Sequence, residues 1–331
     1  MNNFVFHNPT KIIFGKDIVS SVADEIRPYT KSVLLVYGKG SIKETGLYDE
    51  VTGLLEKAGI AWRELSGVDP NPRITSVREG VRLCREHSLG LVLAVGGGSV
   101  LDCAKAIAIG VPYAGDPWDF FTGKADPKEA LPIGTILTLS ATGSEMNQNA
   151  VISNLETVEK IGYGHDLMRP RFSFLDPALT FSVSPYQTAA GSADIMCHLV
   201  EHYFDRTDSA YLQNRLIEAV MRTVVHYTAR ALETPDDYEA RANLMWASTT
   251  ALNGAITCGK VWEGFNHQVE HAVSAVSDIT HGAGLAILMT HWMEEILERD
   301  PSTVGKFAEF ARLVWDIAID DDRKAAARGL T

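Results

Sequence analysis

The chain has 331 residues, and 42 acidic residues outnumber 30 basic ones, which gives a formal net charge of −12. That charge repels the phosphate backbone of nucleic acids and anionic lipid, so we expect neither as a partner. Hydrophobic residues make up 46% of the chain and charged residues 22%, as in ordinary globular proteins. A chain of this length is expected to form two domains.

The four cysteines, Cys84, Cys103, Cys197 and Cys258, are far apart in the sequence and form no Cys-x-x-Cys pair. We therefore expect neither a disulfide framework nor a thiolate zinc site. The first residues lack the basic and apolar regions of a signal peptide, and no uncharged apolar run is long enough to span a bilayer. These features predict a cytoplasmic protein in a reducing compartment, with no membrane contact.

Three nearly continuous apolar runs in the first half of the chain predict buried β-strands. They cover residues 31–37, 89–95 and 133–139. Apolar residues at helical spacing over 47–58 and 76–87 predict crossover helices. This alternation predicts an α/β domain over residues 1–180, with a parallel sheet that is covered by helices on both faces.

Beyond residue 180 the pattern changes to long helical periodicities, which predict an all-helical domain over residues 181–331. The predicted helices cover residues 185–203, 211–232, 238–254, 266–277, 282–298 and 301–316. Residues 320–328 have the acidic-then-basic order that favours the start of another helix, so we expect the chain to be cut short.

Glycine-rich turns follow two of the predicted strands. Gly38-Lys39-Gly40-Ser41 follows the first run, and Gly96-Gly97-Gly98-Ser99 follows the second. Glycine lets the backbone approach a phosphate closely, and the amides at the start of the next helix then donate to it. A tight turn without any ligand is the alternative for one glycine triplet. Two such turns, with Thr138 and the polar segment 140–144 after the third strand, predict a nucleotide-binding crevice.

Histidines and a carboxylate gather in the second half of the chain. Asp194 and His198 stand four residues apart on a predicted helix, as do His267 and His271, and His281 begins the next helix. One carboxylate with three imidazoles suits Fe²⁺, Zn²⁺ or Mn²⁺. For a single histidine the alternative is a hydrogen-bonded structural residue. The spacing predicts a metal site but leaves the choice between His267 and His271 open.

Several short motifs in the same order resemble the iron-containing alcohol dehydrogenase family, particularly its butanol dehydrogenase-like branch. They are Phe-x-Asn-Pro-Thr10-Lys-Ile-Ile-Phe-Gly15, Asp69-Pro-Asn-Pro72, Gly96-Gly-Gly-Ser-Val-Leu-Asp102, Thr138-Leu-Ser-Ala-Thr-Gly-Ser-Glu145 and the histidine segments. The resemblance implies a Rossmann-like nucleotide-binding domain followed by an all-α metal-binding domain.

The resemblance also implies a role for individual residues. The metal ligands would be Asp194, His198, His267 and His281, with Fe²⁺ as the expected ion and Zn²⁺ as the alternative. His271 would lie beside the nicotinamide and relay a proton. The cofactor residues would be Gly96, Gly97, Gly98 and Ser99 at the pyrophosphate, Asp102, Thr138, Thr142, Asn149 and Lys160 around the nicotinamide half, and Asn71 with Gly38, Lys39, Gly40 and Ser41 near the adenosine ribose.

The activity implied by the resemblance is NAD- or NADP-linked oxidation of small primary alcohols and reduction of aldehydes such as butanal. Hydride would pass to or from the nicotinamide while the ion holds the substrate oxygen. Lys39 favours NADP, because its charge attracts a 2′-phosphate that an acidic residue would repel. A solvated turn residue is the alternative for Lys39. The apolar N-terminal strand and the resemblance predict a homodimer.

Other functions on the same scaffold are open at this point. A dehydroquinate synthase-like enzyme would need basic residues near the metal, whereas Trp262, Phe265 and Val269 make these segments apolar. Glycerol dehydrogenase-like and lactaldehyde reductase-like enzymes are closer alternatives. Relatives are expected to continue past Thr331, so an inactive, truncated cofactor-binding protein is a further alternative.

Overall fold

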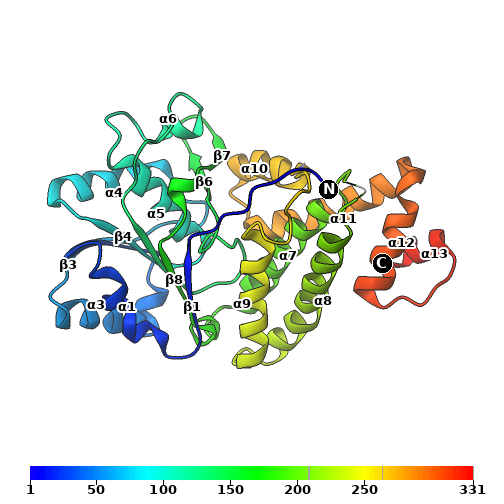
Figure 1. Cartoon of the computed structure of the whole chain (residues 1–331), viewed down its shortest axis with the longest axis horizontal. Coiled ribbons are helices and arrows are strands. Elements are labelled where there is room, and N and C mark those ends of the chain that lie inside the picture. Colours follow the sequence, from blue (N-terminus) through cyan, green and yellow to red (C-terminus); the bar gives the residue numbers. More distant parts are fainter. Residues whose placement is uncertain (208, 263, 331) are drawn as a thin grey trace.

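A six-stranded parallel sheet forms the centre of the first half of the chain, in the order β1-β8-β5-β4-β2-β3 (Figure 1). The computed structural model describes residues 1–207, 209–262 and 264–330; Thr331, the end of the second predicted domain, lies outside them. The strands are β1 (Lys11–Phe14), β2 (Ser32–Tyr37), β3 (Ala61–Leu65), β4 (Leu91–Gly96), β5 (Ile133–Leu137) and β8 (Phe172–Leu175).

The central strands are apolar throughout because both faces of the sheet are covered. Along β2, Leu34 and Val36 pack into one hydrophobic core, whereas Val33 and Leu35 pack into the core on the opposite face. Successive side chains of a strand point to opposite sides, so a strand buried on both faces needs an unbroken apolar run. Each fully buried side chain of this size contributes about 1.5–3 kcal/mol to folding.

Helices fill both layers around the sheet. One core holds α4 and α5, and the other holds α1 and α3. The helices of this half are α1 (Val22–Ile26), α2 (Ser41–Glu44), α3 (Leu47–Lys57), α4 (Ile74–His87), α5 (Gly98–Gly110) and α6 (Trp118–Phe121), with short 3₁₀ helices at Ile18–Ser21, Asp166–Met168 and Pro177–Thr180. An antiparallel hairpin, β6 (Asn149–Asn154) and β7 (Glu159–Gly164), stands outside the sheet beside α10 (Figure 1).

The second half of the described chain is helical. It comprises α7 (Pro185–Tyr203), α8 (Tyr211–Glu233), α9 (Tyr238–Leu252), α10 (Phe265–Ser277), α11 (His281–Arg299), α12 (Val304–Trp315) and α13 (Asp322–Arg328), with a 3₁₀ turn at Pro301–Thr303. The Ser184 hydroxyl accepts a hydrogen bond from the Gln187 amide, and Pro185 occupies the first turn, so α7 begins where these residues favour a helix start. A separate hydrophobic core joins α7, α8, α9, α11 and α12.

The structure confirms the predicted fold class and moves some of the predicted boundaries. The helix predicted over 238–254 ends at Leu252, since Gly254 takes a left-handed conformation with φ of 88°. The apolar strand expected near the N-terminus is β1, which begins at Lys11, and the preceding residues Phe4, Val5 and Phe6 are exposed and irregular. None of the described helices is both long enough and apolar enough to cross a membrane.

Candidate metal and nucleotide site

The two glycine-rich turns lie side by side at the carboxyl edge of the parallel sheet. Strands β2 and β4 pair with Tyr37 opposite Val95, and β4 and β5 pair with Gly96 opposite Leu137. The turns that follow these strands therefore emerge at one edge. The chain runs outward from β2 to β3 and then crosses back to β4, so the edge between β2 and β4 is a topological switch point, where open α/β sheets bind ligands.

The second glycine turn brings the start of a long helix to this edge. Gly96 ends β4, Gly97 caps α5, and Gly98 and Ser99 form its first turn. A β-carbon on Gly98 would lie 2.5 Å from the hydroxyl oxygen of Thr142, so a larger residue would displace that segment. Amides at the start of an α-helix point outward along its axis and can donate to an anion.

Asp102 is buried on α5 and holds the segment that follows β5. One of its carboxylate oxygens accepts the Ser144 hydroxyl at 2.6 Å, and the other accepts the Val151 amide at 2.9 Å. The amide of Thr138 donates to the Gly96 carbonyl at 3.0 Å. Thr142 and the exposed Asn149 belong to the same segment, so the structure brings these predicted residues together.

Lys105 lies one turn beyond Asp102 on α5, and the sequence analysis assigned it no role. Its ammonium donates to the Asn147 carbonyl, the Asn147 side chain and the Asn149 carbonyl, each at 2.9 Å. The side chain is fully buried, and this burial lowers the pKa of Lys105 to about 8. Lys105 follows Asp102 by three residues, and this spacing places both side chains on one face of the helix.

At the first glycine turn, Lys39 is not a free charge. Its ammonium pairs with the Asp69 carboxylate at 2.7 Å, and both side chains are exposed. Asn71 is buried with φ of 54°, and its amide donates to the Asp278 carboxylate at 2.9 Å. Asn71 therefore links the loop after β3 to the loop between α10 and α11.

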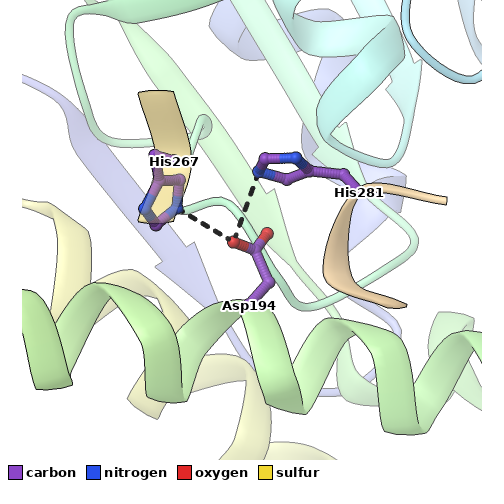
Figure 2. Close-up of side chains that lie close together, drawn as sticks. All are labelled: Asp194, His267 and His281. Carbon is purple, nitrogen blue, oxygen red and sulfur yellow. Dashed lines mark ion pairs between the residues drawn. The ribbon is translucent and has the colours of Figure 1, made fainter. Parts of the chain in front are cut away.

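Three imidazoles converge on one carboxylate oxygen in the helical half. The Nε2 atoms of His198, His267 and His281 lie 3.3, 3.6 and 3.7 Å from Asp194 Oδ1. Figure 2 shows Asp194 extending from α7 between His267 and His281. Asp194 Oδ1, His267 and His281 form a group whose ligand atoms are all within 4.8 Å of one another, and His198 Nε2 lies 3.1 Å from His267 Nε2.

These residues fit a divalent cation. Asp194 Oδ1 is buried and has no hydrogen-bond partner of good geometry among the described residues, although buried polar atoms normally have one. Burial opposes ionisation, but the neighbouring imidazoles, His281 foremost, hold the pKa of Asp194 well below its usual value. Several nitrogens around an anionic oxygen that lacks a partner form the donor set that Fe²⁺ or Zn²⁺ prefers.

Close packing between helices brings these four side chains together from three segments. Asp194 and His198 project from the same face of α7, whereas His267 lies in the first turn of α10 and His281 begins α11. A β-carbon on Gly282 would lie 1.9 Å from the Ala190 carbonyl oxygen, so α11 approaches α7 this closely because residue 282 is glycine.

His271 lies one turn beyond His267 and groups with Glu270 and His281 instead of with Asp194. Its ring centroid is 5.7 Å from that of His281. Burial, with the charges of His281 and Lys160, lowers the pKa of His271 to about 3, so the ring is neutral at pH 7.

Lys160 reaches this cluster from β7. Its ammonium pairs with the Glu270 carboxylate at 3.0 Å, and it also donates to the Ser274 hydroxyl at 3.1 Å. Glu270 contacts the His281 ring and a second buried carboxylate, Glu201, contacts the His267 ring; the sequence analysis assigned no role to either glutamate. Glu201 stands three residues after His198 on α7, a helical spacing that could have identified it.

Two family models match the chain. The model described as iron-containing alcohol dehydrogenase covers residues 9–177, and the C-terminal model of the Fe-containing alcohol dehydrogenase family covers residues 188–329.

Individual relatives agree with these matches. The chain is 53% identical to NADH-dependent butanol dehydrogenase A of Clostridium acetobutylicum, over 99% of this chain and 84% of that protein. It is 39% identical to the NADPH-dependent aldehyde reductase YqhD of Escherichia coli, over 100% of this chain and 85% of that protein. The crystal structure of NADH-dependent butanol dehydrogenase A from Thermotoga maritima superposes with a TM-score of 0.95 at 44% identity, covering 100% of this chain and 82% of that one.

The convergence on Asp194 predicts that Asp194→Asn removes the metal while preserving the fold. Asparagine has the same shape but no charge, so we expect metal affinity to fall more than about 100-fold, beyond the loss typical of groups that only support a ligand. Elemental analysis of protein purified without oxygen measures this. A variant that retains full metal content, with unfolding by heat unchanged, would contradict the site.

Proposed function

Because the chain belongs to the iron-containing alcohol dehydrogenase family, we propose that it is a metal-dependent, NAD(P)-linked alcohol dehydrogenase and aldehyde reductase acting on small primary alcohols and aldehydes. One observation carries this proposal. Three imidazole nitrogens surround the buried Asp194 oxygen, in a chain that also places two glycine turns at one sheet edge.

In this proposal Asp194, His198, His267 and His281 hold a divalent ion, Fe²⁺ first and Zn²⁺ as the alternative. When bound, the ion supplies Lewis-acid polarisation of the substrate oxygen, and the nicotinamide supplies or accepts hydride. Trp262 lies beside this cluster, with its ring centroid 6.1 Å from that of His267. Its apolar surface favours a small, weakly charged substrate over a phosphorylated acid.

The cofactor is proposed to lie along the sheet edge. Residues 96–99 would receive the pyrophosphate at the start of α5, and residues 38–41 with Asn71 would lie near the adenosine ribose. Thr138, Thr142 and Asn149 would surround the nicotinamide half, with Asp102 and Lys160 behind them. In this arrangement residues 1–180 form the dinucleotide-binding domain and residues 181–331 the metal-binding domain.

His271 is proposed to relay the proton that alcohol oxidation releases. Its neutral ring carries a proton on one nitrogen only, so it can take up a proton on the other nitrogen while it releases the first, and it stands one turn from the proposed ligand His267 on α10. In aldehyde reduction the same ring would return a proton to the product oxygen.

The choice between NAD and NADP depends on the Lys39–Asp69 pair. Lys39 alone would favour the 2′-phosphate of NADP, but the Asp69 carboxylate offsets this charge. The family includes relatives of both kinds, an NADH-dependent butanol dehydrogenase and an NADPH-dependent aldehyde reductase. We propose that Lys39, with its charge offset by Asp69, allows either NAD or NADP to bind.

A homodimer in the cytoplasm is proposed as the working form. Strand β1 is an edge of the sheet and pairs with β8 alone, and Phe4, Val5 and Phe6 are exposed nearby in the sequence. A second copy could cover such an edge and its apolar flank.

Oxidation of NADH and NADPH with short aldehydes, including butanal, tests the proposed activity. We expect turnover by the purified enzyme, its loss after treatment with a chelator, and its return when Fe²⁺ or Zn²⁺ is added under anaerobic conditions. Full activity of the metal-free protein would refute the metal model. Binding of cofactor and metal without any turnover would favour the alternative of an inactive cofactor-binding protein.

Asp69→Asn tests the ion pair at the first glycine turn. The change frees the charge of Lys39, so the ratio of kcat/KM for NADPH to that for NADH should rise a few-fold, in line with about 0.2–1 kcal/mol for an exposed charge pair. Asp126→Asn, which breaks the exposed pair with Lys128, serves as the matched control. An unchanged ratio would place Lys39 away from the ribose.

His271→Ala tests the proton relay. Loss of the ring should alter the pH dependence of kcat/KM, because the released proton then needs another route. His226→Ala, at an exposed histidine on α8, should leave the profile as in the wild type. A pH–rate profile of His271→Ala that matches the wild type would remove His271 from the mechanism.

A further inference from the structure

His267 and His281, two of the imidazoles around Asp194, each contact a buried glutamate through the ring nitrogen that faces away from Asp194. His267 Nδ1 lies 2.7 Å from Glu201 Oε2, and His281 Nδ1 lies 2.5 Å from Glu270 Oε2. Both glutamates are at most 5% exposed. The same arrangement therefore occurs twice. Glu201 on α7 contacts His267, and Glu270 on α10 contacts His281.

These contacts determine which nitrogen of each ring is available. A neutral imidazole carries its proton on one nitrogen and offers the other as a ligand. A carboxylate at Nδ1 accepts the Nδ1 proton, which leaves the lone pair on Nε2. In both rings that Nε2 is the atom 3.6–3.7 Å from Asp194 Oδ1, so the glutamates also fix the direction in which each ring points.

Each glutamate is itself held by further hydrogen bonds. Glu201 accepts the indole N–H of Trp262 at 2.9 Å and the backbone amide of His267 at 3.2 Å. Glu270 accepts the Lys160 ammonium at 3.0 Å. Lys160 comes from the β6–β7 hairpin, so the first half of the chain helps to orient a ring in the second half.

We propose that Glu201 and Glu270 are positioning residues that orient His267 and His281 for metal binding, with Trp262 and Lys160 holding the two carboxylates in place. The inference rests on the proposed function, because it requires that the imidazoles bind an ion. A structural role alone would make these glutamates important for folding but would leave metal affinity unchanged in any variant that folds.

Titration of the metal-free 331-residue chain with Co²⁺, followed by its visible d–d absorption, tests the proposal. Glu201→Ala and Glu270→Ala should each bind Co²⁺ about 10–100-fold more weakly than the wild type, with altered band intensities that report changed ligand geometry. Glu201→Gln and Glu270→Gln keep an oxygen that accepts the Nδ1 proton, so they should bind more tightly than the alanine variants. The glutamine variants carry the test if an alanine variant fails to fold.

Glu218→Gln provides the matched control. Glu218 is also a buried glutamate of the helical half, but it accepts the Tyr203 hydroxyl at 2.6 Å and contacts Arg215 instead of a metal-site ring. This variant should lose stability and keep wild-type Co²⁺ affinity.

The outcomes separate this inference from the proposed function. If the wild type binds Co²⁺, Asp194→Asn does not, and the Glu201 and Glu270 variants bind as the wild type does, then the positioning role is wrong and the metal site stands. If the wild type does not bind Co²⁺, the metal site is wrong and the positioning role falls with it.

Discussion

The buried carboxylate of Asp194 is the constraint on which the helical half depends. An ionised oxygen inside a protein needs compensating groups, because burial without them is costly. Here three imidazoles on α7, α10 and α11 place their Nε2 atoms within 3.3–3.7 Å of that oxygen, and a divalent ion held among them would supply the compensation. The need to bring α11 close to α7 explains Gly282, and the need to orient the rings explains two buried glutamates.

The two halves of the chain meet at α10 and at the loop that follows it. Lys160 on β7 pairs with Glu270 on α10 at 3.0 Å, and Asn71 and Arg73 before α4 both contact Asp278 after α10. The sheet edge and the side chains around Asp194 are thus joined by ionic and hydrogen-bonded contacts. Hydride transfer needs cofactor and substrate in a fixed relation, and these contacts provide a physical means of fixing it.

Periodicity in the sequence predicted the elements in which buried and exposed side chains follow a regular pattern. The strands β2, β4 and β5 and the helix Pro185–Tyr203 were found because a doubly covered strand is apolar throughout and a packed helix repeats every 3.6 residues. Strand β3 and the β6–β7 hairpin were missed. β3 is an edge strand with three exposed residues, and the left-handed position of the hairpin turn is occupied by Val158, a β-branched residue that does not predict such a turn.

The sequence by itself determined the fold class, the family and the residue types of the candidate metal site, because local spacing places Asp194 and His198 on one helix face. The tertiary structure decided which ring nitrogens meet. His267 and His271 stand four residues apart on one face of α10, so spacing alone does not separate them. The packing of α10 against α7 brings His267 Nε2 toward Asp194, whereas His271 groups with Glu270. It also decided the partners of Lys39, Lys105 and Lys160, since contacts between distant segments leave no period in the sequence.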